Sequence, residues 1–199
     1  MTEANILRLK NMATEADILR LKDMAIDPTV KIGGDWLKEL HGEAQVERFD
    51  WMGYYRFLYL VAQSIKPELT VEVGTNQGTS AVFMKKGHPE GEVNTVDVLK
   101  IPAAATTLKR FDIHYHIMDS LKYTPPPFPI DLMFFDTSHT YGQTLAEYEK
   151  FSPLVRAGGV MCFDDVSVSP DMERFWSGLE ATKIPLPELH HSGFGVVLG

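Results

Sequence analysis

The chain contains little cysteine, no long hydrophobic run and fewer basic than acidic residues. Because Cys162 is its single cysteine, an internal disulfide is excluded, which is usual for proteins of reducing compartments. The apolar neighbours Met161 and Phe163 predict that this thiol is buried. No apolar run approaches the ~20 residues that a transmembrane helix needs, and the N-terminus lacks a continuous apolar signal-peptide core. We therefore expect a soluble, cytoplasmic protein without a membrane partner.

The surplus of acidic residues bears on the class of partner. A formal net charge of -8 disfavours sequence-independent binding to the phosphate backbone of nucleic acids. We therefore expect a small-molecule substrate and no nucleic-acid partner. At 199 residues and 44% hydrophobic content, the chain is long enough for one well-packed α/β core and too short for two ordinary domains.

Residues 2–13 and 14–25 form a tandem repeat whose copies differ only by two exchanges of Asn for Asp. Both copies have helical patterns. Twelve residues at ~3.6 per turn rotate the second apolar stripe by about 120° from the first, so one continuous helix could not bury both against one surface. The repeat is either a duplication or cloning artefact, or an added helix for interaction and homo-oligomerisation. We define residues 1–34 as an N-terminal helical extension and residues 35–199 as the main domain.

The main domain begins with two predicted helices, over residues 35–48 and 50–65, which we expect to pack on the sheet edge and partly cover the site. After them, strand and helix patterns alternate, which predicts an α/β fold with a doubly wound, mostly parallel sheet. The chain then ends in a predicted β-hairpin of two short strands over residues 186–199. The expected strands are 70–74, 92–98, 112–118, 130–136 and 159–164, and the expected helices are 79–87, 101–110, 143–155 and 171–181.

A glycine turn follows the first of these strands, in the segment Thr70–Ser80 with the sequence TVEVGTNQGTS. Gly74 and Gly78 permit a tight turn and a close approach to a ligand, and the helix that begins near Thr79 offers unpaired N–H groups. A dinucleotide fingerprint would read G-x-G-x-x-G, whereas here Glu72 stands two residues before the first glycine. A carboxylate at this position suits a ligand that carries an ammonium group.

This acidic-x-G-x-x-x-G pattern resembles the first motif of the class I S-adenosylmethionine-dependent methyltransferases. Asp97 ends the second predicted strand, where a carboxylate can accept hydrogen bonds from ribose hydroxyls. Asp119 and Ser120 follow the third strand, where the family has a polar residue near the adenine amino group. A helix-capping role is the alternative for both aspartates. The resemblance implies that S-adenosylmethionine is the cofactor and that the residues binding it are Glu72, Gly74, Thr75, Asn76, Gly78, Ser80, Asp97, Asp119 and Ser120.

Three carboxylates follow the next two strands: Asp136 ends the fourth, and Asp164 and Asp165 end the fifth. Adjacent parallel strands point them at one spot, where their repulsion would raise their pKa values unless a cation lay among them. Mg²⁺ prefers oxygen ligands and keeps positions open for substrate, so we predict a divalent-metal site at these residues. A hydroxyl bound to the metal is easier to deprotonate, and His139 is the predicted catalytic base.

The segments FDTSHTY at 135–141, AGGV at 157–160 and FDD at 163–165 resemble the metal-dependent O-methyltransferases, which include catechol-type enzymes and the macrolide-sugar and cephalosporin-hydroxylase-like groups. The resemblance covers residues 50–199 and implies a seven-stranded, Rossmann-like class I methyltransferase sheet. Unlike catechol-type enzymes, the chain has no lysine just after the first metal ligand. This favours the sugar-modifying groups and His139 as the base, although little sequence remains for a substrate lid.

The resemblance implies methyl transfer from S-adenosylmethionine to a hydroxyl of a small molecule, either sugar-like or a vicinal diol, with help from a divalent metal. The alternatives are a metal-independent small-molecule methyltransferase and a non-catalytic S-adenosylmethionine-binding or scaffold protein. Loss of turnover with a chelator would separate the metal-dependent enzyme from the others. We expect His190 and His191 to be ordinary strand residues rather than ligands, because we expect the hairpin to lie away from the acidic strand ends.

Overall fold

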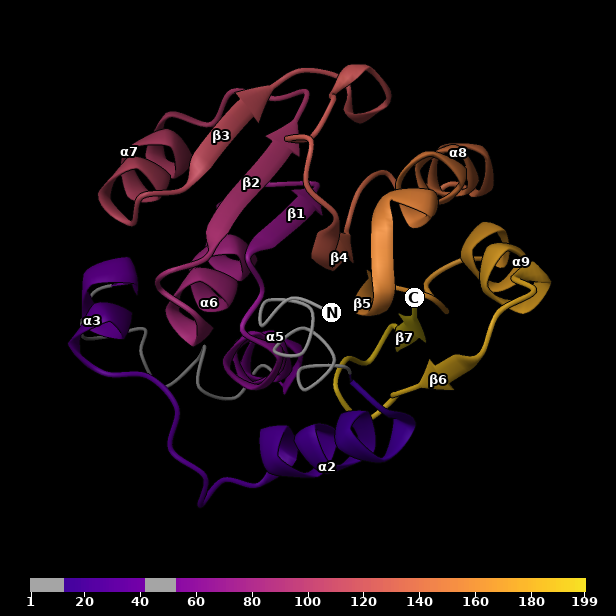
Figure 1. The fold of residues 1–199 in the computed structure, drawn as a ribbon, viewed down its shortest axis with the longest axis horizontal. Helices are drawn as coiled ribbons and strands as arrows, with labels where there is room; N and C mark the ends of the chain where they lie inside the picture. The colour runs from indigo at the N-terminus through magenta and orange to yellow at the C-terminus, as the bar shows by residue number, and fades with distance from the viewer. Residues whose placement is uncertain (1–12, 42–52) are drawn as a thin grey trace, which may run out of the picture.

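The computed structural model describes residues 13–41 and 53–199, and its centre is one seven-stranded sheet (Figure 1). In spatial order the strands are β3 (His114–Ile117), β2 (Glu92–Asp97), β1 (Leu69–Val73), β4 (Ile130–Phe135), β5 (Val155–Asp164), β7 (Phe194–Leu198) and β6 (Lys183–Pro185). The first five pair in parallel, whereas β7 is antiparallel to both of its neighbours. The predicted fold class, including the terminal hairpin, is confirmed.

Helices cover both faces of this sheet. Their bounds are α2 (Glu15–Ile26), α3 (Asp35–His41), α5 (Gly53–Ile65), α6 (Thr79–Gly87), α7 (Pro102–Arg110), α8 (Tyr141–Phe151) and α9 (Pro170–Gly178), with 3-10 turns η2 (Ser120–Lys122) and η3 (Ser152–Leu154). Helices α8 and α9 pack on one face, and α5 and α6 pack on the other with α7 beside α6 (Figure 1). The helix predicted over 143–155 begins and ends earlier than expected, at Tyr141 and Phe151.

The central strands are hydrophobic because helices bury them on both sides. Every residue of β1 and β4 is buried, including Glu72 and Asp131. A parallel strand between two helical layers has no solvent-facing side, which explains the near-continuous apolar run of β4, whose sequence is IDLMFF. Cys162 of β5 is completely buried, as predicted, and burial raises the pKa of its thiol. The carboxyl ends of β1, β2 and β4 consequently form one rigid edge.

Helix α5 packs on a sheet face, so its predicted place at the sheet edge was wrong. Its residues Phe57 and Val61 are completely buried and share a core with Phe134 of β4 and Val196 of β7. The reason is that α5 is apolar around most of its circumference, and such a helix buries more area against a sheet face than at an edge. Residues 42–52, which the two predicted N-terminal helices include, lie outside the described residues.

Helix α2, the second copy of the tandem repeat, docks on α5. Thr14 caps it: its Oγ1 accepts a hydrogen bond from the Asp17 amide at 3.2 Å, and the Asp17 carboxylate accepts one from the Thr14 amide at 3.1 Å. Ile18 and Leu21 are buried against the core. Arg56 of α5 donates to backbone carbonyls in the last turn of α2 and just after it, which anchors the segment to α5. The first copy, apart from Ala13, lies outside the described residues, and the boundary at residue 34 stays a prediction.

The C-terminal hairpin begins earlier than its predicted bounds. Strand β6 spans Lys183–Pro185, and residues 186–192 connect it to β7 instead of forming a strand. Because β7 runs antiparallel to β5, its first residue, Phe194, pairs with Asp164 at the carboxyl end of β5. The connection before β7 therefore meets the acidic strand ends. None of the helices in the described ranges combines the length and apolar character needed to cross a membrane.

Candidate functional site

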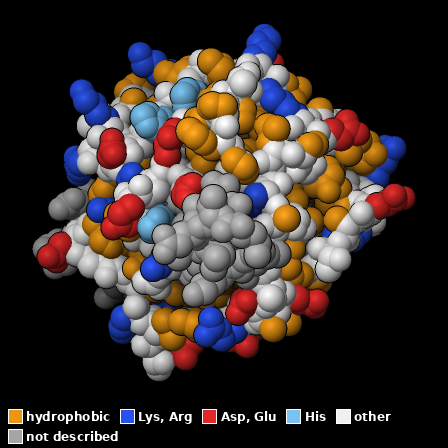
Figure 2. Space-filling model, in the orientation of Figure 1, with side chains coloured by type: hydrophobic (Ala, Val, Ile, Leu, Met, Phe, Trp, Pro, Cys, Tyr) orange, Lys and Arg blue, Asp and Glu red, His pale blue; other side chains and the backbone are white. Residues whose placement is uncertain are grey.

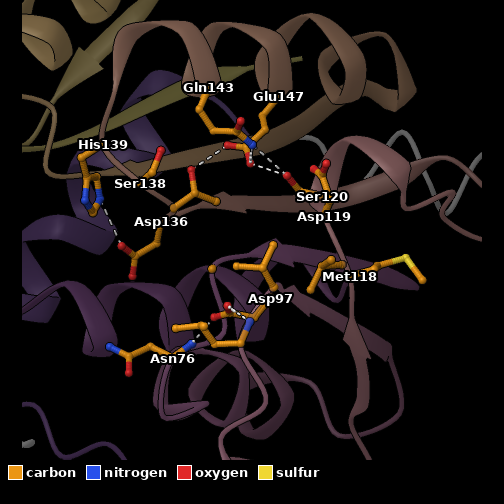
Figure 3. Close-up of a pocket in the computed structure, with 15 residues that line it drawn as sticks. Asn76, Asp97, Met118, Asp119, Ser120, Asp136, Ser138, His139, Gln143 and Glu147 are labelled. Carbon is orange, nitrogen blue, oxygen red and sulfur yellow. Dashed lines mark hydrogen bonds and ion pairs between the residues drawn. The ribbon is translucent and has the colours of Figure 1, made fainter.

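A cavity of about 610 Å³ opens at the carboxyl ends of β1, β2 and β4 (Figure 3). This is the edge of a doubly wound sheet where ligands bind, near the point at which the strand order reverses. Its volume lies in the range of small-molecule and cofactor sites. Among the described residues it is lined by Gly74, Asn76, Val96, Asp97, Val98, Leu99, Met118, Asp119, Ser120, Asp136, Thr137, Ser138, His139, Gln143 and Glu147.

The two glycines of the predicted turn both have positive φ, +96° at Gly74 and +78° at Gly78. A Cβ at residue 74 would lie 1.7 Å from the backbone oxygen of Asp136, so the end of β1 can approach the end of β4 only with glycine there. A Cβ at residue 78 would lie 2.8 Å from Leu108 of α7. The turn thus serves close packing within the protein, and Gly74 also lines the cavity.

Glu72 supports the turn from the protein interior and is not among the cavity-lining residues. It is completely buried and accepts hydrogen bonds from the hydroxyls of Ser80 and Thr95. Thr95 also pairs with the Thr75 hydroxyl at 2.6 Å. Glu72, Thr75, Gly78 and Ser80 therefore shape the loop, and the expected contact of Glu72 with an ammonium group has no counterpart in this geometry. Burial raises the pKa of Glu72 to about 8, so it is largely protonated at neutral pH.

We predict that Glu72→Gln flattens the pH dependence of stability. Between the usual carboxyl pKa of 4.5 and the folded value of about 8, the native state holds a proton that the unfolded state has released. Wild-type stability should therefore fall as pH rises through this window, by about 1.4 kcal/mol per pH unit from this group. Glutamine mimics the protonated carboxyl and cannot titrate. Melting curves of both proteins from pH 5 to 8 check this, and parallel curves would contradict it.

Asp97 lies at the cavity, as predicted. Its Oδ2 accepts a hydrogen bond from the Asn76 amide and its Oδ1 accepts one from the Leu99 amide, each at 2.9 Å. These contacts hold the carboxylate in one orientation between the glycine turn and the loop after β2, while lone pairs remain for further donors. Asp119 also lines the cavity, but its Oδ1 caps η2 by accepting from the Leu121 amide at 2.9 Å. The capping alternative therefore describes part of its role.

A buried carboxylate that the sequence did not single out lies on the α8 side of the cavity. Glu147 of α8 is completely buried and accepts hydrogen bonds from Ser120 Oγ at 2.5 Å, Thr137 Oγ1 at 2.7 Å and Gln143 Nε2 at 2.8 Å (Figure 3). The sequence carried a signal, because Glu147 stands between Thr144 and Phe151 on the buried stripe of α8. An acidic residue in such a stripe needs buried donors.

Asp164 and Asp165 come together as predicted, and His190 joins them. Atoms of these three residues lie within 4.8 Å of one another, with His190 Nδ1 at 2.9 Å from Asp164 and 3.2 Å from Asp165. The expectation that His190 lies away from the acids was wrong, because antiparallel β7 brings the preceding connection to the end of β5. The Asp164 carboxylate raises the pKa of His190. His191 packs edge-on against the His190 ring.

Asp136 pairs first with His139. The Nε2 atom of His139 lies 3.2 Å from Asp136 Oδ1 and 3.5 Å from Asp165 Oδ2. The Asp136 carboxylate raises the pKa of His139, and burial together with the charges of Asp164 and Asp165 raises the pKa of Asp136. His139 has a positive φ of +52°, a backbone conformation that aims its ring back at the strand ends. This group joins the cavity to the Asp164, Asp165 and His190 group.

Two tyrosines of α5 form an uncharged wall beside these carboxylates. The Tyr54 ring lies 5.0 Å from the His190 ring, and the centroids of the Tyr54 and Tyr55 rings lie 4.1 Å apart with the planes tilted by 41°. Burial raises the pKa of both phenols, that of Tyr55 to about 12, so both stay neutral. A neutral, low-dielectric wall strengthens the interaction of the carboxylates with any cation or imidazolium between them.

Comparisons with known proteins agree with this fold. Residues 71–166 match the family model of a methyltransferase domain. A search of curated proteins found no match to the sequence. The solved O-methyltransferase TomG from Streptomyces achromogenes, involved in tomaymycin synthesis and in complex with S-adenosylmethionine, is 21% identical with a TM-score of 0.61, over 85% of this chain and 92% of that one.

Two further structures are similar. An O-methyltransferase from Bacillus cereus in complex with S-adenosylhomocysteine is 19% identical with a TM-score of 0.59, over 92% of this chain and 97% of that one. A methyltransferase from Geobacter sulfurreducens is 15% identical with a TM-score of 0.63, over 93% and 97%. The predicted resemblance to class I S-adenosylmethionine-dependent methyltransferases is thereby confirmed.

Proposed function

We propose that the protein transfers a methyl group from S-adenosylmethionine to a hydroxyl of a small molecule. The observation that carries the proposal is the cavity itself, which begins between Asp97 and Asn76 and ends at the Asp136–His139 pair (Figure 3). A nucleoside binds at the first end and a reacting oxygen at the second. A sugar-like compound or a vicinal diol fits as the acceptor, because it offers two neighbouring oxygens at this end of the cavity. We place the reaction in the cytoplasm.

The residues at the first end fit the cofactor. One Asp97 oxygen faces the glycine turn and the other faces the loop after β2, and their remaining lone pairs can accept hydrogen bonds from two ribose hydroxyls. Val98 and Leu99 are 66% and 63% exposed, and Met118 is 41% exposed, which leaves apolar surface for a planar base. Figure 2 shows hydrophobic side chains gathered on the upper part of this face of the molecule. Ligand burial is the usual reason for such an exposed apolar patch beside a cavity.

The residues at the second end fit a divalent ion. Asp165 Oδ1 is buried and accepts no hydrogen bond from the described residues, although His190 Nδ1 lies 3.2 Å away. Two carboxylates and an imidazole form a donor set that Mg²⁺ or Mn²⁺ accepts. Asp164, Asp165 and His190 would hold the ion, with Asp136 as the further predicted ligand. When bound, the cofactor supplies an activated methyl on a sulfonium, and the ion supplies positive charge beside the acceptor oxygen.

The residues of the chain then do two things. Asp97 and the glycine turn hold the cofactor in line with the acceptor, since positioning provides much of the rate in such transfers. His139 takes the hydroxyl proton, and the Asp136 and Asp165 carboxylates stabilise that proton at Nε2. The acceptor oxygen forms the new bond to the methyl carbon while the carbon–sulfur bond breaks, which leaves S-adenosylhomocysteine.

S-adenosylhomocysteine should raise the melting temperature by about 5–10 °C at 100 times its dissociation constant, because it binds only the folded state. Asp97→Ala should weaken binding by about 10- to 100-fold, since ribose loses a charged acceptor. Asp23→Ala, an exposed aspartate of α2, is the matched control and should change nothing. Melting curves measure the stabilisation, and calorimetric titration measures the affinities of the two variants. An unchanged melting temperature at millimolar ligand would remove the cofactor assignment.

A further inference from the structure

The α8 side of the cavity contains an amide whose orientation is set by its neighbours. Gln143 and Glu147 stand one helical turn apart on α8, and both line the cavity. Gln143 Nε2 donates to Glu147 Oε1 at 2.8 Å and to Ser120 Oγ at 3.1 Å. The Ser120 hydroxyl uses its own proton on Glu147 Oε1, so it can only accept from Gln143. The nitrogen end of the amide is thus turned toward Glu147 and Ser120.

This arrangement permits only one orientation of the Gln143 amide. A carboxylate offers acceptors only, so rotation of the amide by 180° would place its oxygen against Glu147 Oε1 and lose two hydrogen bonds. Glu147 is itself held by Thr137 Oγ1 at 2.7 Å and is completely buried, so it cannot turn away. Gln143 therefore keeps its Oε1 atom free: within the described ranges, no donor is bonded to it.

A fixed acceptor at this position selects among purine bases. The 6-amino group of adenine is a donor, whereas the 6-oxo group of hypoxanthine is an acceptor and would face the Gln143 oxygen. Asp119 is the other candidate reader of the base, but one of its oxygens already caps η2 and the other lies 4.0 Å from the Lys122 ammonium. The side chains of Leu99 and Met118 are apolar and can contact only the faces of the base. Polar contacts of the base must therefore be made along its edge.

We propose that Gln143 reads the 6-amino group of the cofactor's adenine and that Glu147 is the positioning residue that fixes the Gln143 amide. The inference rests on the proposed function, because it requires an adenosyl ligand in this cavity. It assigns the discrimination of the base to α8 instead of to the loop after β3, where the family resemblance puts it.

The test compares S-adenosylhomocysteine with S-inosylhomocysteine, which differ at position 6 of the base and in the proton on N1, by calorimetric titration. Wild-type protein should prefer the adenosyl ligand by about 10- to 100-fold, which is the effect of one lost hydrogen bond and one unpaired polar group. Gln143→Ala should reduce this preference to less than about threefold. Glu147→Gln should reduce it in part, since its amide lets the Gln143 amide turn. Gln63→Ala, an exposed glutamine on α5, should keep the full preference.

The ratio of the two affinities is informative because a merely structural role would weaken both ligands alike. Asp119→Ala should keep the preference even where it lowers both affinities. Loss of the preference in Asp119→Ala and its retention in Gln143→Ala would overturn the inference and leave the proposed function standing. Equal binding of the two ligands to wild type would do the same. Failure of wild type to bind S-adenosylhomocysteine would overturn both. Gln143 is partly exposed, so its alanine variant should fold, which a melting curve verifies.

Discussion

His139→Ala is expected to lower the rate of the chemical step by about 10²–10⁴-fold, the usual contribution of a positioned base. His139 lies at the cavity, 3.2 Å from the Asp136 carboxylate, and no other imidazole lines the cavity among the described residues. Cofactor affinity should change little, because the proposed ribose contact, Asp97, lies at the end of another strand. Single-turnover kinetics measures the rate, and calorimetry measures the affinity.

The pH profile gives the same experiment a second readout. A base must be deprotonated to act, so the wild-type rate should rise with pH through the pKa of His139, which Asp136 raises above 6.5. The alanine variant should lose this acidic limb. His114→Ala, an exposed histidine on β3, is the matched control and should keep it. Full turnover with the wild-type profile in His139→Ala would show that another group accepts the proton.

Asp164→Ala is expected to abolish divalent-ion binding and chelator-sensitive turnover. Asp164 is 4% exposed and contacts His190, so its loss leaves two donors where there were three. S-adenosylhomocysteine affinity should change by less than about twofold, since the proposed cofactor contacts lie at other strand ends. Titration of Mn²⁺ into protein saturated with S-adenosylhomocysteine measures the first effect.

Two candidate ligand sets share Asp164 and Asp165: one adds His190, and the other adds Asp136. Variants of two neighbouring histidines distinguish them. His190→Ala should weaken Mn²⁺ binding about 10-fold or more, whereas His191→Ala, which packs on the same ring, should not. Asp136→Ala tests the ligand predicted from the sequence in the same titration. If wild type gave no Mn²⁺ binding with cofactor present, the metal-independent alternative would replace the metal-dependent one, with the Asp136–His139 pair as its base.

The parts of the site that the sequence predicted are those tied to strand ends. Gly74, Asp97 and Asp136 each follow a strand in a run of alternating strands and helices, and parallel strands bring their carboxyl ends to one edge. Positive φ at both predicted glycines follows from the same turn. Local pattern and right-handed connectivity are enough for these residues, because their places depend on strand order alone.

Other residues could not be placed from local pattern. Whether Glu72 faced a ligand or the protein interior depended on Ser80 and Thr95, which come from another helix and another strand. The hydrogen-bond donors of Glu147, Ser120 and Thr137, likewise come from other segments of the chain. In each case a buried carboxylate needs donors, and the sequence does not tell which segment supplies them.

The sequence alone determined that this protein is an α/β chain with a glycine turn and with acidic residues along one sheet edge. It could do so because hydrophobic periodicity and the residues at strand ends are local properties of the sequence. The tertiary structure alone decided which groups meet there. The antiparallel pairing of Phe194 with Asp164 brought His190 to the acids, and the packing of α8 aimed Gln143 into the cavity. Contacts between segments far apart in the chain depend on how the layers pack, and packing is a property of the whole core.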